Sequence, residues 1–120
     1  MEINQLTEIV IGKAFVVSNS LGVGYLEKVY ENALAFELRD AGLRVEQQKS
    51  IPVVYRGVIV GDYIADILVD DQLILEIKAT KAIDLAHEAQ LLNYLKSTGI
   101  HTGLLLNFGT SHLGIKRKAL

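Results

Sequence analysis

Two carboxylates and a lysine lie close together in the middle of the chain, where a β-hairpin would gather them. Asp66 and Glu76 belong to two apolar runs separated by a short polar segment, and Lys78 follows Glu76 by two positions. Carboxylate oxygens are the usual ligands of hard divalent cations. Such a cation polarises a phosphodiester and makes its bound water nucleophilic at neutral pH, and a neighbouring lysine can stabilise the transition state. These residues therefore predict metal-assisted hydrolysis.

The loop length decides whether the three groups meet. Alternate residues of a strand share a face, so Glu76 and Lys78 point the same way. A three-residue loop, Asp70-Asp71-Gln72, pairs Asp66 with Glu76, whereas a two-residue loop would turn Asp66 to the other face. We expect the three-residue loop. The opposite face of the hairpin would then carry Tyr63, Ala65, Ile67, Val69, Leu73, Leu75 and Ile77.

The face of the carboxylates is not a solvated one, because Ile64, Leu68 and Ile74 share it. Both faces of the hairpin thus look covered by other elements. Buried charges are costly unless they are paired or bind a metal. The alternative, a salt-bridged ladder at the edge of a sheet, stays open at this point.

The surrounding pattern predicts a mixed α/β fold. We expect helices over about 4–18, 25–40 and 81–97, because apolar residues recur at helical spacing and glycines follow. Strands are expected over 43–55, 58–60, the central hairpin and 102–108, with a further edge strand near 115–117. The run 102–108 is almost wholly apolar and suits a covered sheet. Pro52 places the first of these at an edge or delays its start. The order is helix, helix, three or more strands, helix, strand.

Composition bounds the classes of protein. A chain of 120 residues, half of them hydrophobic, forms one domain with a single core, covering 1–120. No apolar run approaches the length of a membrane span, and we expect a soluble, cytoplasmic protein. With no cysteine there is no disulfide and no thiolate site. The net charge of −2 gives no general attraction to nucleic acid.

Two helices offer further polar residues. Glu27 and Tyr30 lie three apart in the second helix and share a face. Gln90 and Tyr94 lie four apart in the third. Taken singly, a surface glutamate and a boundary face with ordinary hydrogen bonds are the commoner situations.

Several motifs in order resemble the GxxExxY protein family, which belongs to the PD-(D/E)xK nuclease-like superfamily. The resemblance begins at Gly24-Tyr25-Leu26-Glu27-Lys28-Val29-Tyr30 and covers nearly the whole chain. It continues through Ile51-Pro52-Val53-Val54-Tyr55-Arg56-Gly57, Tyr63-Ile64-Ala65-Asp66, Glu76-Ile77-Lys78-Ala79, Gln90-Leu91-Leu92-Asn93-Tyr94-Leu95 and Leu105-Leu106-Asn107-Phe108-Gly109. Ala65 stands where the superfamily's name places a proline.

The resemblance implies a restriction-endonuclease-like core, a mixed sheet flanked by helices. It implies that Asp66 and Glu76 bind Mg²⁺ or Mn²⁺, with Glu27 as an accessory acidic ligand. Lys78 would be the catalytic lysine, and Gln90 would face the site. Tyr30 and Tyr94 are the residues that we expect to contact the substrate.

The leading hypothesis is a magnesium- or manganese-dependent nuclease-like domain that acts on DNA or RNA. The rival is a binding or assembly module that keeps the fold without turnover and self-associates through an apolar edge strand, either Thr102 to Phe108 or the edge near Ile115. A third alternative, nucleic-acid binding without cleavage, predicts strongly salt-dependent affinity.

Overall fold

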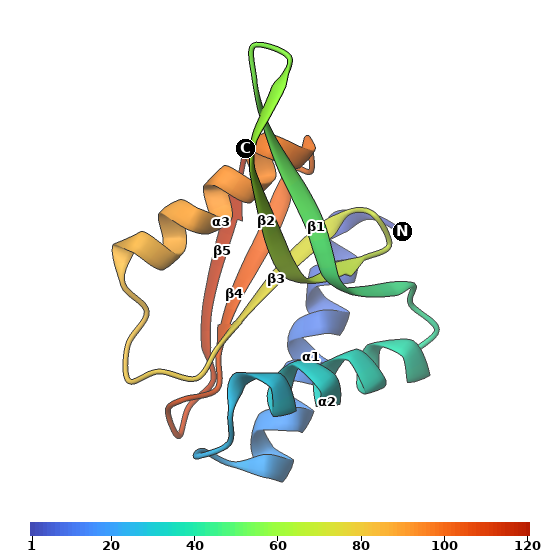
Figure 1. Cartoon of the computed structure of the whole chain (residues 1–120). Helices are drawn as coiled ribbons and strands as arrows, with labels where there is room; N and C mark the ends of the chain where they lie inside the picture. Colours follow the sequence, from blue (N-terminus) through green and yellow to red (C-terminus); the bar gives the residue numbers. More distant parts are fainter.

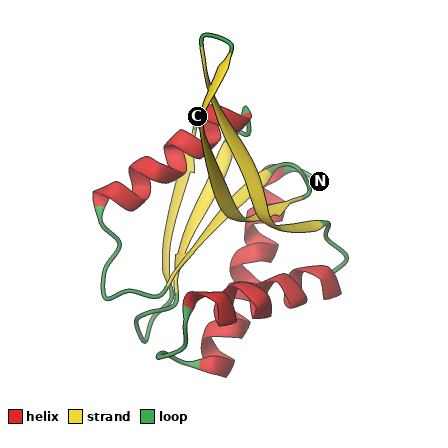
Figure 2. Ribbon diagram, viewed as in Figure 1, coloured by secondary structure: helices red, strands yellow, loops and turns green.

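The computed structural model describes all 120 residues as a mixed sheet covered by helices on both faces (Figure 2). The helices are α1 (Ile3–Leu21), α2 (Glu27–Asp40) and α3 (Leu85–Thr98). The strands are β1 (Val45–Tyr55), β2 (Val58–Val69), β3 (Leu73–Lys78), β4 (Thr102–Asn107) and β5 (Gly114–Ala119). The predicted fold class is confirmed.

The sheet has the order β1-β2-β3-β4-β5, and only the β3–β4 pair is parallel. Helix α3 makes the crossover between these two strands and packs on one face, while α1 and α2 cover the other (Figure 1). The first apolar cluster joins α1 and α2 to the sheet, and the second joins α3 to it. Both faces of the central hairpin are therefore covered from Ala65 onward, as the sequence predicts, whereas Tyr63 and Ile64 at its start are exposed.

Helix α3 packs on the sheet over a glycine. A Cβ at Gly103 of β4 would lie 2.7 Å from Cδ1 of Leu91, so a larger residue there would require the side chain of Leu91 to shift. The helix begins later than its periodicity suggests. Asp84 caps it by accepting from the backbone of His87, whose ring accepts in turn from the backbone of Asp84.

Three expectations differ from the structure. The run 58–60 is not a separate strand, because β2 continues unbroken from Val58 to Val69. The run from Thr102 is not an edge strand, because β4 lies between β3 and β5. Every residue of β4 is buried, so its apolar character reflects an interior position rather than an edge that could pair with another copy.

The third difference concerns the face of Ala65. Ala65 packs in the α3-side cluster with Leu68, whereas Ile67 packs in the cluster of α1 and α2. The strict alternation fails because β1 is distorted opposite this point: Gln48 has a φ of 55° and forms no regular pair with β2. The distortion falls beside Asp66.

The edges of the sheet follow the sequence. β1 carries Pro52 and is an edge strand, and β5 at the other edge confirms the strand expected near 115–117. None of the helices is both long and apolar enough to cross a lipid bilayer.

Candidate active site

The β2–β3 hairpin has the predicted register. Ile67 pairs with Leu75 and Val69 with Leu73, which leaves the loop 70–72 and sets Asp66 opposite Glu76. The loop is held by its own polar groups, since the carboxylate of Asp70 accepts from the backbone of Arg44 at 2.8 Å. The odd loop length therefore brings the two carboxylates together, as expected.

At Asp66 the backbone ladder between β2 and β3 gives way to side chains. Oε1 of Glu76 accepts from the backbone N–H of Asp66 at 3.1 Å, and Oδ2 of Asp66 accepts from the backbone N–H of Ile77 at 2.7 Å. Each carboxylate thus uses one oxygen to hold the opposing strand. The second oxygen of each has no hydrogen-bond donor within the chain.

Burial and the charges of neighbouring carboxylates disfavour ionisation of both groups. Only 4% of Glu76 is exposed, and desolvation, followed by the charge of Asp66, raises its pKa to about 8. Desolvation is also the main cause that raises the pKa of Asp66, with the charge of Glu31 adding to it. A backbone hydrogen bond and Lys78 oppose these shifts without cancelling them. A cation placed between the carboxylates would favour the charged forms.

Lys78 ends β3, one strand step beyond Glu76 on the same face, and is half-buried. The backbone of Lys78 is held by the residues at the end of β4 and just after it. The backbone N–H of Phe108 donates to the carbonyl of Lys78 at 2.8 Å. The buried side chain of Asn107 bonds both backbone groups of Thr80, at 3.1 and 3.0 Å. Asn107 therefore anchors the chain that leaves the site.

A hollow of about 590 Å³ opens beside Asp66, toward the start of α2. Glu27 lines it from the first turn of α2 and is exposed. The charge of Glu27 contributes to the raised pKa of both Asp66 and Glu76. However, no three acidic or histidine side chains are gathered closely enough to hold an ion together. Glu27 is thus near the pair without completing a three-carboxylate group.

Helix α3 brings Tyr94 to the other side of the carboxylates. Desolvation, followed by the charges of Glu76 and Asp66, raises the pKa of Tyr94 to about 12. Its ring lies 5.8 Å from that of Tyr63, between ring centroids. Gln90 is half-buried one turn earlier on the same helix. Tyr94 stays protonated at neutral pH and is a hydrogen-bond donor at this edge of the site.

Tyr30 occupies a different position from the one expected. The residue is fully buried, and its ring stacks on Phe108 with centroids 4.9 Å apart. Its hydroxyl donates to the carbonyl of Gly22 at 2.6 Å and accepts from the backbone of Tyr25 at 3.2 Å. These contacts join the start of α2 to the end of β4, and we do not count Tyr30 among the substrate contacts.

Two residues near the carboxylates, Glu31 and Gln48, were not predicted from the sequence. Glu31 is only 3% exposed and accepts from Nε2 of Gln48 at 2.8 Å and from Nε2 of Gln47 at 2.7 Å. Lys28 also pairs with it at 3.0 Å. Glu31 follows Glu27 by four positions and so shares its helix face, a signal that could have drawn attention to it. Gln48 could not have been found, since its role comes from a backbone distortion.

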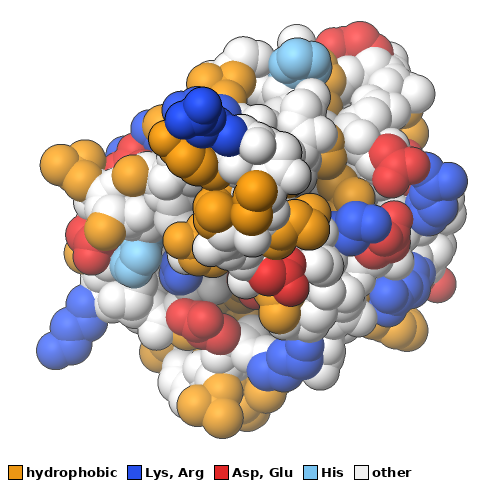
Figure 3. Space-filling model, turned by 45° about the horizontal axis from the view of Figure 1, so that its top comes forward, with side chains coloured by type: hydrophobic (Ala, Val, Ile, Leu, Met, Phe, Trp, Pro, Cys, Tyr) orange, Lys and Arg blue, Asp and Glu red, His pale blue; other side chains and the backbone are white.

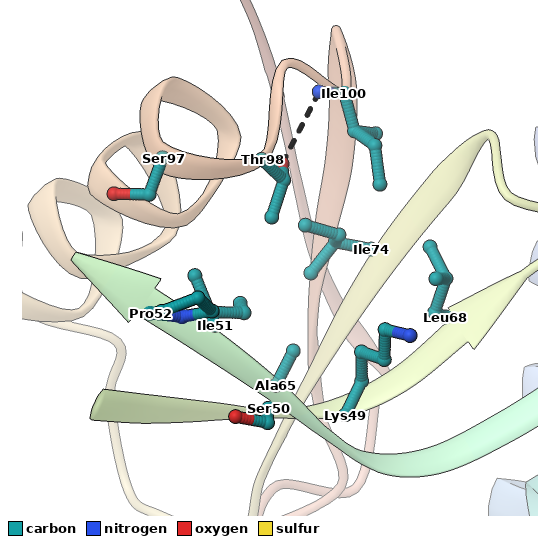
Figure 4. Close-up of a pocket in the computed structure, with 10 residues that line it drawn as sticks. All are labelled: Lys49, Ser50, Ile51, Pro52, Ala65, Leu68, Ile74, Ser97, Thr98 and Ile100. Atoms are coloured by element: carbon teal, nitrogen blue, oxygen red, sulfur yellow. Dashed lines mark hydrogen bonds between the residues drawn. The ribbon is translucent and has the colours of Figure 1, made fainter. Parts of the chain in front are cut away.

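A second hollow lies away from the carboxylates. It has about 230 Å³ and lies between the base of the β1–β2 hairpin and the C-terminal end of α3 (Figure 4). Ile51, Ala65 and Ile74 supply much of its lining, and Ser97 and Thr98 lie at the helix. This hollow contains no acidic residue, in contrast to the hollow at Asp66.

A mixed sheet whose central hairpin carries two carboxylates and a lysine in this arrangement defines a nuclease-like fold. Comparison with known families supports this, because residues 4–118 match the model of the PD-(D/E)XK nuclease superfamily. The chain belongs to that superfamily. No curated protein and no solved structure matches the chain.

Divalent metal ions are general among PD-(D/E)XK nucleases. The residues present fit a magnesium-like ion, which is commonly held by one or two carboxylates while water and substrate phosphate complete its shell. Asp66 and Glu76 supply two such groups, each with a free oxygen.

Proposed function

We propose that the chain hydrolyses phosphodiester bonds of DNA or RNA, with Mg²⁺ or Mn²⁺ held by Asp66 and Glu76 and with Glu27 as an accessory acidic group. The observation that carries the proposal is the pair of hydrogen bonds by which each carboxylate accepts from the backbone of the opposing strand, at the point where β2 separates from β3. These bonds leave one oxygen of each carboxylate without a partner. The motifs quoted from the sequence support placement within the GxxExxY family.

The bound ion would polarise the phosphodiester and activate water. The chain's own groups supply the rest. Lys78 lies beside the carboxylates and offsets negative charge that develops on the phosphate. Tyr94, kept protonated, donates a hydrogen bond from the α3 side, and Gln90 binds the substrate from the preceding turn. Glu27 faces the same hollow from α2.

The test is cleavage of single- and double-stranded DNA and RNA with added Mg²⁺ or Mn²⁺. We expect Glu76→Ala and Lys78→Ala to lower the rate by about a hundredfold or more, as removal of a charge-stabilising group does in other active sites. The matched control is Lys96→Ala, an exposed lysine on α3, which should cleave at the normal rate. Wild-type protein that is inert on every substrate, or equal rates for the Lys78 variant, would refute the proposal.

A further inference from the structure

The ends of β1 and β2 form a two-stranded arm that projects from the sheet. Residues 53–64 make up this arm, and a tight turn at Arg56 and Gly57, both with positive φ, closes its tip. Figure 1 shows the arm extending beyond the helices. The β2–β3 pairing is confined to residues 67–69 of β2, so the outer part of β2 has no neighbour on its second edge. The arm is thus open along both edges.

The arm exposes apolar side chains to an unusual degree. Half or more of each of seven large side chains is accessible, namely Val54, Tyr55, Val58, Ile59, Val60, Tyr63 and Ile64. Figure 3, in which the top of the molecule comes forward, shows apolar side chains gathered near the centre of this view. An isolated two-stranded ribbon is marginally stable in water at best, and a contiguous apolar surface of this kind marks an interaction site.

The exposed apolar side chains are distributed over both faces of the arm, because successive residues of a strand point to opposite faces. Charge argues against a nucleic-acid partner, because the arm holds one cation, Arg56, and one anion, Asp62. The arm is therefore suited to an apolar protein surface without a strong charge of either sign.

Both edges of the arm are unpaired, and they differ at the base of the arm. There, Pro52 of β1 has no N–H to donate and Lys49 lies near it, so the base of β1 carries two of the features that prevent edge pairing. The outer part of β2, from Val58 to Ala65, has no proline and no lysine. Val60 forms a bulge there, because the register with β1 shifts between Val53 and Val54.

We propose that the arm binds the arm of a second copy of this chain about a twofold axis. Antiparallel packing of β2 against β2 is self-complementary, as an isologous interface must be. With Ile59 on the axis, Arg56 of one copy comes opposite Asp62 of the second copy, and the reverse. Arg56 forms no ion pair within its own chain, and Asp62 is bonded only by the hydroxyl of Ser50 at 2.7 Å. This inference is independent of the proposed nuclease activity.

The first test is the mass of the wild-type protein by light scattering and sedimentation over a wide concentration range. We expect a dimer whose dissociation constant rises at least tenfold in Ile59→Thr and Val58→Thr, which keep strand propensity. The control is Phe36→Gln, since Phe36 of α2 is as exposed as Ile59 but lies off the arm. Circular dichroism and thermal melting establish that each variant folds.

Exchange of the two charged residues and cross-linking through an introduced cysteine test the proposed geometry of the dimer. Arg56→Asp and Asp62→Arg should each weaken the dimer, and the double exchange should restore it, although the bond to Ser50 is lost in both variants that alter Asp62. Because the chain has no cysteine, Ile59→Cys should form a disulfide-linked dimer under mild oxidation, while Phe36→Cys should not. A monomeric wild type, or equal cross-linking of the two cysteine variants, would overturn the proposal. Loss of nucleic-acid binding in arm variants of a monomeric wild type would assign the arm to the substrate instead.

Discussion

The carboxylate of Glu76 accepts from the backbone of Asp66, while the carboxylate of Asp66 accepts from the backbone of Ile77, the residue after Glu76. The two side chains therefore replace the backbone ladder at the point where β2 leaves β3. This arrangement holds two carboxyl groups close together in a buried place, where ionisation of both is disfavoured, and leaves one oxygen of each without a hydrogen bond. Because burial disfavours ionisation of these groups, the stability of the protein and its affinity for divalent ions should depend on pH.

Stability without divalent ions should fall as the pH rises from about 5 to about 8. Burial raises the pKa of Glu76 from 4.5 in the unfolded chain to about 8 in the folded protein, so the folded state binds the proton more tightly between these values. The stabilising effect is complete below pH 4.5 and is lost as the pH passes 8. A tenfold difference in proton affinity corresponds to about 1.4 kcal/mol, so the whole effect amounts to a few kcal/mol. Thermal melting across this range checks it.

The isosteric variant provides the control for that experiment. Glu76→Gln cannot ionise and should show a flatter profile, with a melting temperature above that of wild type at pH 8. An equally steep decline in the variant would show that another group carries the dependence.

Addition of Mg²⁺ or Mn²⁺ should reverse the loss of stability at high pH. A cation that binds only the folded protein stabilises it in proportion to the logarithm of its concentration above Kd. Affinity should rise with pH toward 8, because protons and the ion compete for the same carboxylates. Calorimetric titration should show binding to wild type and to Asp40→Asn, an exposed position at the end of α2, and none to Asp66→Asn. Binding to the Asp66 variant with normal affinity would remove that residue from the ligands.

Gly109→Ala should destabilise the protein by about 1–3 kcal/mol, the usual cost of overpacking. A Cβ at Gly109 would overlap the backbone of Thr80, just after Lys78. The comparison is Gly12→Ala in α1, where no atom lies within 4 Å of the added carbon and helix propensity predicts a gain of about 0.5–1 kcal/mol. Chemical denaturation measures both, and a neutral Gly109 variant would mean that the chain after β3 moves freely.

Glu31→Gln should cost about 1–3 kcal/mol, because a buried acceptor of several hydrogen bonds is replaced by a group with a misplaced donor. The variant should also lower the pKa of Asp66, since the charge of Glu31 is among the causes that raise it. Glu37→Gln on the same helix is the control for denaturation. Carboxyl titration by NMR follows Asp66, and an unchanged pKa would separate Glu31 from the site.

The sequence predicted the hairpin register because that register depends on local features, the alternation of apolar residues and an odd loop. The pairing of Asp66 with Glu76 could be predicted from the sequence because it follows from that register. The apolar run 102–108 predicted a covered strand, and β4 is buried throughout. The rival use of this run as an edge strand was wrong, because the place of β4 between β3 and β5 depends on a crossover and on the late strand β5, which local patterns do not encode. The face of Ala65 was wrong because the distortion at Gln48 lies on a different strand. The burial of Tyr30 depends on Phe108, far along the chain.

The location of Asp66, Glu76 and Lys78 on one hairpin has a consequence for folding. Neighbouring strands joined by a short loop close with little loss of chain entropy, and such local contacts form early. The carboxylates can therefore meet while water still surrounds them and screens their repulsion. Their desolvation comes only when α2 and α3 dock, so the barrier to this docking should be lower in acid than at neutral pH.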